Sequence, residues 1–202
     1  MIKNASRLSF AKQDVRRLFE LYGTRDYIGE DGVSQVSHAF QTAFLTYRSL
    51  RAANGAINIV PIKHMIVAGW LHDIGQLKAF DEDNAARSIW GVQKHEQIGS
   101  KYLESLGFPH TVFRLVEYHV KAKRYMVTTN ETYRDKLSAA SLATLDEQGG
   151  TLSEQEVRAF KADKLFHAAL FLRLADDKAK QPIDVVDFNG AFEHVWKLVE
   201  GK

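Results

Sequence analysis

Apolar residues recur along most of the chain with the spacing of an α-helix, and only three prolines interrupt the pattern. Polar, glycine-containing stretches at 24–33 and 77–92 predict loops. The remaining segments predict helices at about 12–22, 34–53, 61–72, 92–106, 109–119, 131–148, 161–180 and 184–199, with a short one opening at Ser153. No segment alternates as a strand does. The pattern therefore predicts an all-α fold.

The predicted helix at 61–72 differs from the others because apolar side chains cover almost all of its faces. A helix of this kind belongs in the centre of a bundle. It ends in His72 and Asp73, two ionisable groups that are costly to bury unless something satisfies them. A metal ion would satisfy both.

The composition limits the classes of protein and of metal site. The 27 basic residues nearly balance the 25 acidic ones, which does not favour nucleic acid as a partner. There is no cysteine, so any metal must use nitrogen and oxygen ligands. No apolar run is long enough to cross a membrane, and we expect one cytoplasmic domain over residues 1–202 with no obligate protein partner.

Further ligand-type residues lie on other predicted helices, at His38, His95, His119 and Asp176. Imidazole and carboxylate suit zinc, manganese or iron, and a shared carboxylate can hold two cations a few ångström apart. The order H…HD…H…H…D resembles the HD superfamily, which implies an HD-domain helical bundle with a dinuclear metal site in its core. By that resemblance His38, His72 and Asp176 hold one metal, His95 and His119 the other, and Asp73 both.

A loop that precedes His38 resembles a loop found in one subgroup of the HD superfamily. The segment 27–30, Tyr-Ile-Gly-Glu, is similar to a loop of the HD-domain mixed-valent diiron oxygenases of phosphonate breakdown, the PhnZ type, which are relatives of myo-inositol oxygenase. The resemblance implies that Tyr27 ligates an iron in the resting enzyme and that Glu30 receives a substrate amino group. The spacing from Tyr27 to His38 is one residue longer than is usual in that family.

The stretches HVKAKRY at 119–125, SAASLAT at 138–144 and RLAD at 173–176 extend the similarity. A phosphonate dianion needs positive charge and hydroxyl donors directed at its oxygens. The resemblance implies that Lys123 and Arg173 supply the charge, and Ser141 and Thr144 the hydroxyls. Gln76 stands where the oxygenases commonly have a histidine facing the phosphonate, and a glutamine can donate a hydrogen bond but cannot carry charge.

These features imply an O2-dependent enzyme with an Fe(II)/Fe(III) pair. The expected reaction cleaves the C–P bond of a 1-hydroxy-2-aminoalkylphosphonate such as (R)-2-amino-1-hydroxyethylphosphonate, giving glycine and phosphate. The expected catalytic residues are Tyr27, Glu30 and Lys123, and the substrate-binding residues are Glu30, Gln76, Lys123, Ser141, Thr144 and Arg173.

Three alternatives remain open. The same chemistry on the trimethylammonio analogue would give glycine betaine. A metal-dependent HD phosphohydrolase of nucleotides or phosphate esters would explain the metal ligands but gives Tyr27 no task. A catalytically silent HD module would be expected to have lost a ligand, and none is missing.

Overall fold

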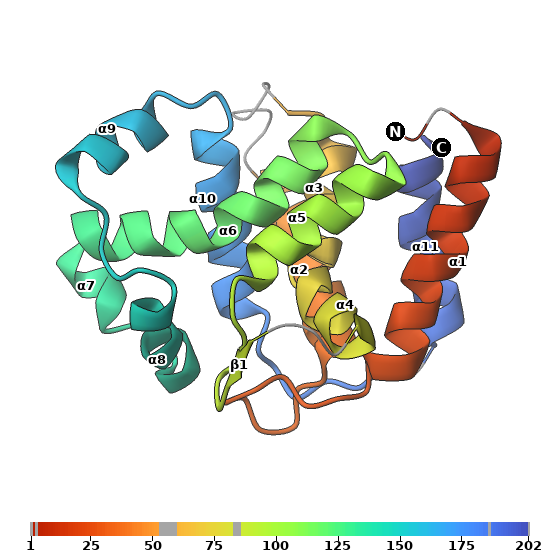
Figure 1. Ribbon diagram of the computed structural model, residues 1–202, viewed down its shortest axis with the longest axis horizontal. Coiled ribbons are helices and arrows are strands. Elements are labelled where there is room, and N and C mark those ends of the chain that lie inside the picture. The colour runs from red at the N-terminus through yellow and green to blue at the C-terminus, as the bar shows by residue number, and fades with distance from the viewer. Residues whose placement is uncertain (1, 3, 53–59, 83–85, 186, 202) are drawn as a thin grey trace.

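The computed structural model describes residues 2, 4–52, 60–82, 86–185 and 187–201. Helices dominate this part of the chain (Figure 1). They are α1 (Ala5–Tyr22), α2 (Gln35–Ala52), α3 (Ile62–Leu71), α4 (Ile74–Glu82), α5 (His95–Leu106), α6 (His110–Thr129), α7 (Glu131–Arg134), α8 (Ala139–Glu147), α9 (Glu154–Lys161), α10 (Phe166–Lys178) and α11 (Phe188–Glu200). The predicted all-α class is confirmed.

The central position predicted for the helix at 61–72 is also confirmed. All seven residues from Met65 to Leu71 are buried in α3, and α1 and α11 lie side by side against the same core (Figure 1). The Trp70 ring stacks on Phe19 of α1 with the ring centroids 5.4 Å apart, and it meets Trp196 of α11 edge-on at 6.3 Å. These aromatic contacts bury a large apolar area around the helix that leads to His72.

A break in the helix separates α3 from α4 and contains His72 and Asp73. The chain then continues as α4, which packs against α5. A Cβ at Gly75 would lie 1.9 Å from the carbonyl oxygen of His95, so only glycine permits this approach. The glycine that follows the His-Asp pair therefore brings the start of α5 against Asp73.

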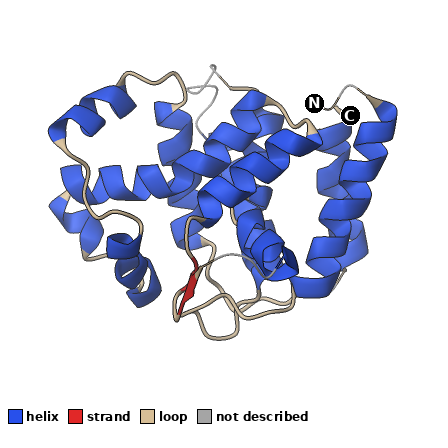
Figure 2. Cartoon of the chain, in the orientation of Figure 1, coloured by secondary structure: helices blue, strands red, loops and turns tan. Residues whose placement is uncertain are grey.

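The predicted loop at 77–92 is wrong over much of its length. Residues 77–82 continue α4, and Arg87–Ser88 (β1) pairs antiparallel with Gly91–Val92 (β2) in a short hairpin (Figure 2). The polar residues of this segment led to the prediction of a loop. They also suit a helix such as α4, which packs through one apolar face and exposes the other. Residues 83–85 lie outside the described part of the chain.

Helix boundaries differ from the predictions where a cap was overlooked. Asn4 accepts a hydrogen bond from the backbone N–H of Arg7, so α1 begins at Ala5 and not at 12. The single helix predicted at 131–148 is two, because Ser138 caps α8 by accepting from the N–H of Ser141. The short helix at Ser153 is confirmed with a full capping box. Residues 53 and 186 of the predicted helices lie outside the described residues.

Two other boundaries also differ from the predictions. The helix predicted at 109–119 begins at His110, after Pro109 as its N-cap residue, and runs on to Thr129. The helix predicted from residue 92 starts at His95 because β2 occupies Gly91–Val92. None of the described helices combines the length and the apolar character needed to cross a membrane.

Candidate metal centre and pocket

The four histidines of the predicted ligand set are buried and held in one orientation. Each Nδ1 lies within hydrogen-bonding distance of a backbone carbonyl, which can only accept, so each Nδ1 carries the proton and each Nε2 presents its lone pair. The pairs are His38 with Ala179 (2.7 Å), His72 with Gly69 (2.8 Å), His95 with Val92 (3.2 Å) and His119 with Val116 (2.6 Å). Bonds of this kind orient histidines at metal sites in general.

The first group of facing atoms comes from α2, the α3–α4 break and α10. The Nε2 atoms of His38 and His72 are 3.0 Å apart. Asp176 Oδ1 lies 3.2 Å from the first and 3.6 Å from the second, and Asp73 Oδ2 lies 3.7 Å and 3.4 Å from them. Two lone-pair nitrogens and two carboxylate oxygens thus converge.

The second group uses the other oxygen of Asp73. The Nε2 atoms of His95 and His119 are 3.2 Å apart, and Asp73 Oδ1 lies 3.2 Å from His95 and 3.5 Å from His119. Asp73 therefore presents one carboxylate oxygen to each group. A carboxylate in this position can bridge two cations, so the residues fit a dinuclear site.

The pKa values of these side chains are consistent with a dinuclear metal site. Burial lowers the pKa of His119 to about 3, so its ring is neutral as a ligand must be. Burial acts in the same direction on His72, but the charges of Asp73 and Asp176 outweigh it and raise its pKa to about 10. In the metal-free protein this ring therefore holds a proton at Nε2, which a bound cation would displace. Despite burial, the charges of neighbouring groups hold the pKa values of both carboxyls well below their usual range. Arg173 and a protonated His72 neutralise part of the charge of these two buried carboxylates, and bound metal ions would supply further positive charge.

Tyr27 lies against the first group. Its ring stacks on His38 with the centroids 3.9 Å apart. Burial, together with the negative charges of Asp73 and Asp176, raises the pKa of the phenol well above its ordinary value. The loop that carries it packs directly on α8, because Gly29 has φ +80° and a Cβ there would lie 2.4 Å from Ala140 Cβ.

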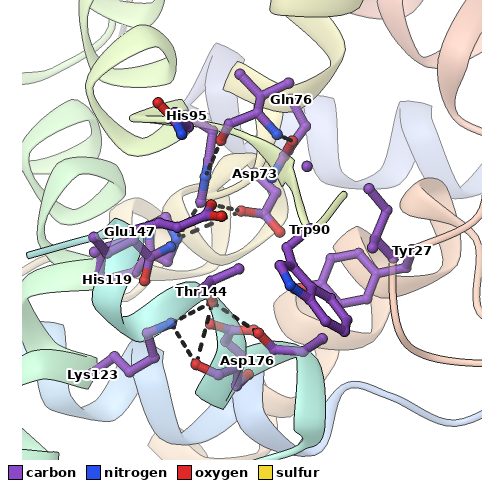
Figure 3. Close-up of a pocket in the computed structure, with 18 of the residues that line it drawn as sticks. Tyr27, Asp73, Gln76, Trp90, His95, His119, Lys123, Thr144, Glu147 and Asp176 are labelled. Atoms are coloured by element: carbon purple, nitrogen blue, oxygen red, sulfur yellow. Dashed lines mark hydrogen bonds and ion pairs between the residues drawn. The ribbon is translucent and has the colours of Figure 1, made fainter. Parts of the chain in front are cut away.

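A pocket opens over the cluster, with Lys123 and α8 on its far wall from Gln76 (Figure 3). The Lys123 ammonium donates to the backbone oxygen of Ser141 at 2.9 Å and to the hydroxyl of Thr144 at 2.8 Å. Lys123 follows His119 by one helical turn, so α6 directs both side chains to the same cavity. The structure therefore brings Lys123, Ser141 and Thr144 to the pocket, as the sequence predicted.

Arg173 also lines the pocket, but its guanidinium is held by other groups. Nη1 lies 2.8 Å from Asp176 Oδ2, Nη2 pairs with Asp177, and Nε donates to the Tyr133 hydroxyl at 3.1 Å. Because the Arg173 guanidinium pairs with Oδ2 of Asp176, the other oxygen of this carboxylate, Oδ1, faces His38. Arg173 thus positions a candidate ligand, a role that the sequence prediction of a phosphonate contact did not include.

Gln76 connects the pocket to the β1–β2 hairpin. Its side-chain oxygen accepts from the N–H of Val92 at 3.0 Å. The described part of the chain offers no acceptor for its amide N–H groups, which can donate to a ligand. The hairpin places Trp90 on the pocket wall (Figure 3). The sequence analysis missed Trp90, whose only signal was an aromatic residue in a polar stretch.

Glu30 was expected to receive a substrate amino group, but the ammonium of Lys180 lies 2.7 Å from its Oε1. Lys180 was also missed by the sequence analysis. It follows Asp176 by four residues but lies beyond the end of α10 at Lys178, so helical spacing alone gave no firm signal.

Comparison with known protein families identifies the class. The HD domain family matches residues 36–178, a range that contains His38, the His72–Asp73 pair, His95, His119 and Asp176. The chain belongs to the HD domain family.

Three curated proteins resemble it over most of their lengths. An uncharacterized protein of Acanthamoeba polyphaga mimivirus is 37% identical over 81% of this chain and 69% of its own. Hydroxymethylphosphonate dioxygenase of Gimesia maris is 32% identical over 82% and 78%. The glycine-betaine-forming [1-hydroxy-2-(trimethylamino)ethyl]phosphonate dioxygenase of Leisingera caerulea is 30% identical over 81% and 77%. The resemblance inferred from the motifs is confirmed, and the chain is an enzyme of the oxidoreductase class.

Proposed function

We propose that this protein cleaves the carbon–phosphorus bond of a 1-hydroxyalkylphosphonate with O2 and releases phosphate. The observation that carries the proposal is the position of Asp73, whose two oxygens each face a pair of lone-pair imidazole nitrogens. The two relatives that are named phosphonate dioxygenases support it.

The ligand set suits iron. It contains nitrogen and oxygen donors and no thiolate, and the phenol of Tyr27 lies in contact with His38 and suits ferric iron. Two iron ions, one ferrous and one ferric, would supply the one-electron chemistry that a reaction with O2 requires. His38, His72 and Asp176 would hold one, His95 and His119 the other, and Asp73 both.

The protein groups around the metals bind and orient the phosphonate. Lys123 supplies positive charge, Ser141 and Thr144 supply hydroxyls, and Gln76 supplies amide N–H donors from the opposite wall. Trp90 adds an apolar ring to the pocket wall, and exclusion of water by that ring would strengthen these contacts.

Three substrates fit this reaction in principle. (R)-2-amino-1-hydroxyethylphosphonate, the substrate expected from the sequence, would give glycine and phosphate. Its trimethylammonio analogue would give glycine betaine, and a substrate with no amino group would give a simple carboxylate. The pocket wall that contains Lys180 helps to decide which of these three substrates the enzyme uses.

The test is phosphate release from these 1-hydroxyalkylphosphonates by iron-loaded, partly oxidised protein in air and under argon. We expect release from at least one of them that requires O2. Release of equal size under argon would indicate hydrolysis, and no release from any of them in air would exclude the proposed reaction.

The variant Tyr27→Phe distinguishes an oxygenase from a hydrolase that uses the same metal ligands. We expect the variant to lose visible phenolate-to-iron absorption and to release phosphate about 10- to 100-fold more slowly. The matched control is Tyr47→Phe, since Tyr47 is 42% exposed on α2. An unchanged spectrum and rate in Tyr27→Phe would contradict a role for the phenol.

A further inference from the structure

The ammonium of Lys180 is fully bonded at the edge of the pocket. It donates to Glu30 Oε1 at 2.7 Å, Ser138 Oγ at 2.7 Å and Ser141 Oγ at 3.2 Å. A lysine ammonium has three donors, so all are used. The side chain is only 11% exposed. Displacing this ammonium would leave three polar groups without their partner.

Lys180 also stands between Glu30 and the cavity. The described residues that line the pocket include Lys180, Tyr27 and Ser141 but not Glu30. The backbone just before Lys180 is fixed, because the carbonyl of Ala179 accepts from the Nδ1 of His38. A substrate that enters the pocket therefore meets an ammonium group on this wall and not a carboxylate.

We propose, on the basis of the function proposed above, that Lys180 is a specificity-determining residue that selects 1-hydroxyalkylphosphonates without an ammonium group. The side chain occupies the acceptor that a substrate amine would need. A second ammonium on this wall would face a like charge at close range, which is unfavourable. Hydroxymethylphosphonate and its neutral alkyl homologues carry no such charge.

One other carboxylate of the pocket wall has to be considered. Glu147 lines the pocket outside the candidate metal ligands, and its Oε2 accepts from the Ser88 hydroxyl at 2.8 Å. Glu147 is exposed, so water screens its charge and weakens its attraction for a substrate amine. It does not replace the enclosed acceptor that Lys180 occupies.

The reaction on the selected class balances without another reactant. In hydroxymethylphosphonate, one C–H bond and the C–P bond break, and their electrons reduce O2. One oxygen atom of O2 ends on carbon and the other on phosphorus. The dianion of hydroxymethylphosphonate and O2 thus give formate, hydrogen phosphate and one proton.

The experiment measures kcat/KM for two substrates of nearly the same shape, one neutral and one with an ammonium group. Hydroxymethylphosphonate is assayed beside them as a third substrate. (R)-1-hydroxypropylphosphonate has a methyl group where (R)-2-amino-1-hydroxyethylphosphonate has an ammonium group. We expect iron-loaded wild-type protein to have a kcat/KM at least about 100-fold higher for the neutral substrate. Lys180→Met, which uncovers Glu30, should reduce that ratio at least about tenfold.

Two variants control for charge and folding. Lys180→Arg keeps the charge and Lys178→Met removes an exposed lysine close by, and both should keep the wild-type ratio. The proposal is overturned if the wild type uses the amine at least as well as its neutral analogue, if Lys180→Arg loses the preference, or if a folded, iron-binding Lys180→Met keeps the full ratio. Phosphate release from the trimethylammonio analogue alone would also overturn the proposal, whereas absence of phosphate from that analogue and from all three substrates would overturn the proposed function itself.

Discussion

Lys123 is 2% exposed, so its charge depends on its surroundings. Burial, aided by the positive charge of Arg173, lowers its pKa from 10.5 to about 7. An amine that titrates near neutral pH binds an anion only below its pKa, when it carries a proton. This makes Lys123 the residue through which pH should control phosphonate binding.

The prediction is that kcat/KM for the phosphonate falls as pH rises through about 7. Lys123→Arg should remove this fall, because a guanidinium stays charged throughout the range. The substrate has its own protonation steps, and these persist in the variant and serve as the internal control. The measurement is a pH profile of phosphate release for both proteins, and identical profiles would exclude Lys123 as the titrating group.

The same pKa shift has a consequence for stability. Between about pH 7 and 10.5 the unfolded chain holds a proton on Lys123 that the folded protein has lost. The free energy of unfolding should therefore rise with pH in this window. Below about pH 7 both states are protonated, so Lys123 no longer makes stability depend on pH, and the cost of burying its charged ammonium is felt in full.

At the scale of elements, the approach of α4 to α5 sets the second half of the candidate metal centre. Gly75 is the contact point, and the backbone of His95 lies directly against it. A side chain at this position must push the two helices apart, because the opposing atom is a backbone oxygen that cannot rotate away.

Gly75→Ala should therefore destabilise the protein by about 3 kcal/mol and reduce the amount of iron bound. Urea unfolding and metal analysis measure the two effects. Lys101→Ala, an exposed change on α5, should alter neither. A Gly75→Ala protein with wild-type stability and iron content would show that α4 can move without disturbing His95.

Element boundaries also show where local sequence is a poor guide. The α8 helix is short and begins at Ser138, whose hydroxyl caps it and also accepts from Lys180. Sequence reasoning merged α7 and α8, since the residues around Leu137 continue a helical pattern and a serine alone does not reveal a cap. The break nevertheless matters, because it brings the N-terminus of α8 to the pocket.

At the scale of the whole molecule, the candidate ligands come from α2, the α3–α4 break, α5, α6 and α10. Bound metal would therefore connect helices that are distant in sequence. A ligand that binds only the folded state stabilises it by about 2.7 kcal/mol when its free concentration is 100 times Kd.

Removal of metal should accordingly lower Tm by about 5–10 °C in a chain of this size. Scanning calorimetry of iron-loaded and chelator-treated protein measures the shift. His119→Ala should lose most of it, whereas His110→Ala, an exposed histidine, should retain it. Equal shifts in both variants would place the bound metal elsewhere.

The sequence by itself determined the helical class, the central helix and the set of ligand-type residues. Periodicity and residue chemistry are local properties, so they can be read without knowing the contacts. The ordered histidines and aspartates were a sufficient signal for the HD domain family, and the structure brings all six together.

Only the tertiary structure decided how the remaining charges are paired. Glu30 and Lys180 are 150 residues apart in the chain, and Arg173 divides its donors between Asp176, Asp177 and Tyr133. An acid or base in the sequence has many possible partners, and packing of distant segments selects one. The ligands are therefore visible in the sequence, whereas the charge that a substrate meets on the pocket wall depends on the folded chain.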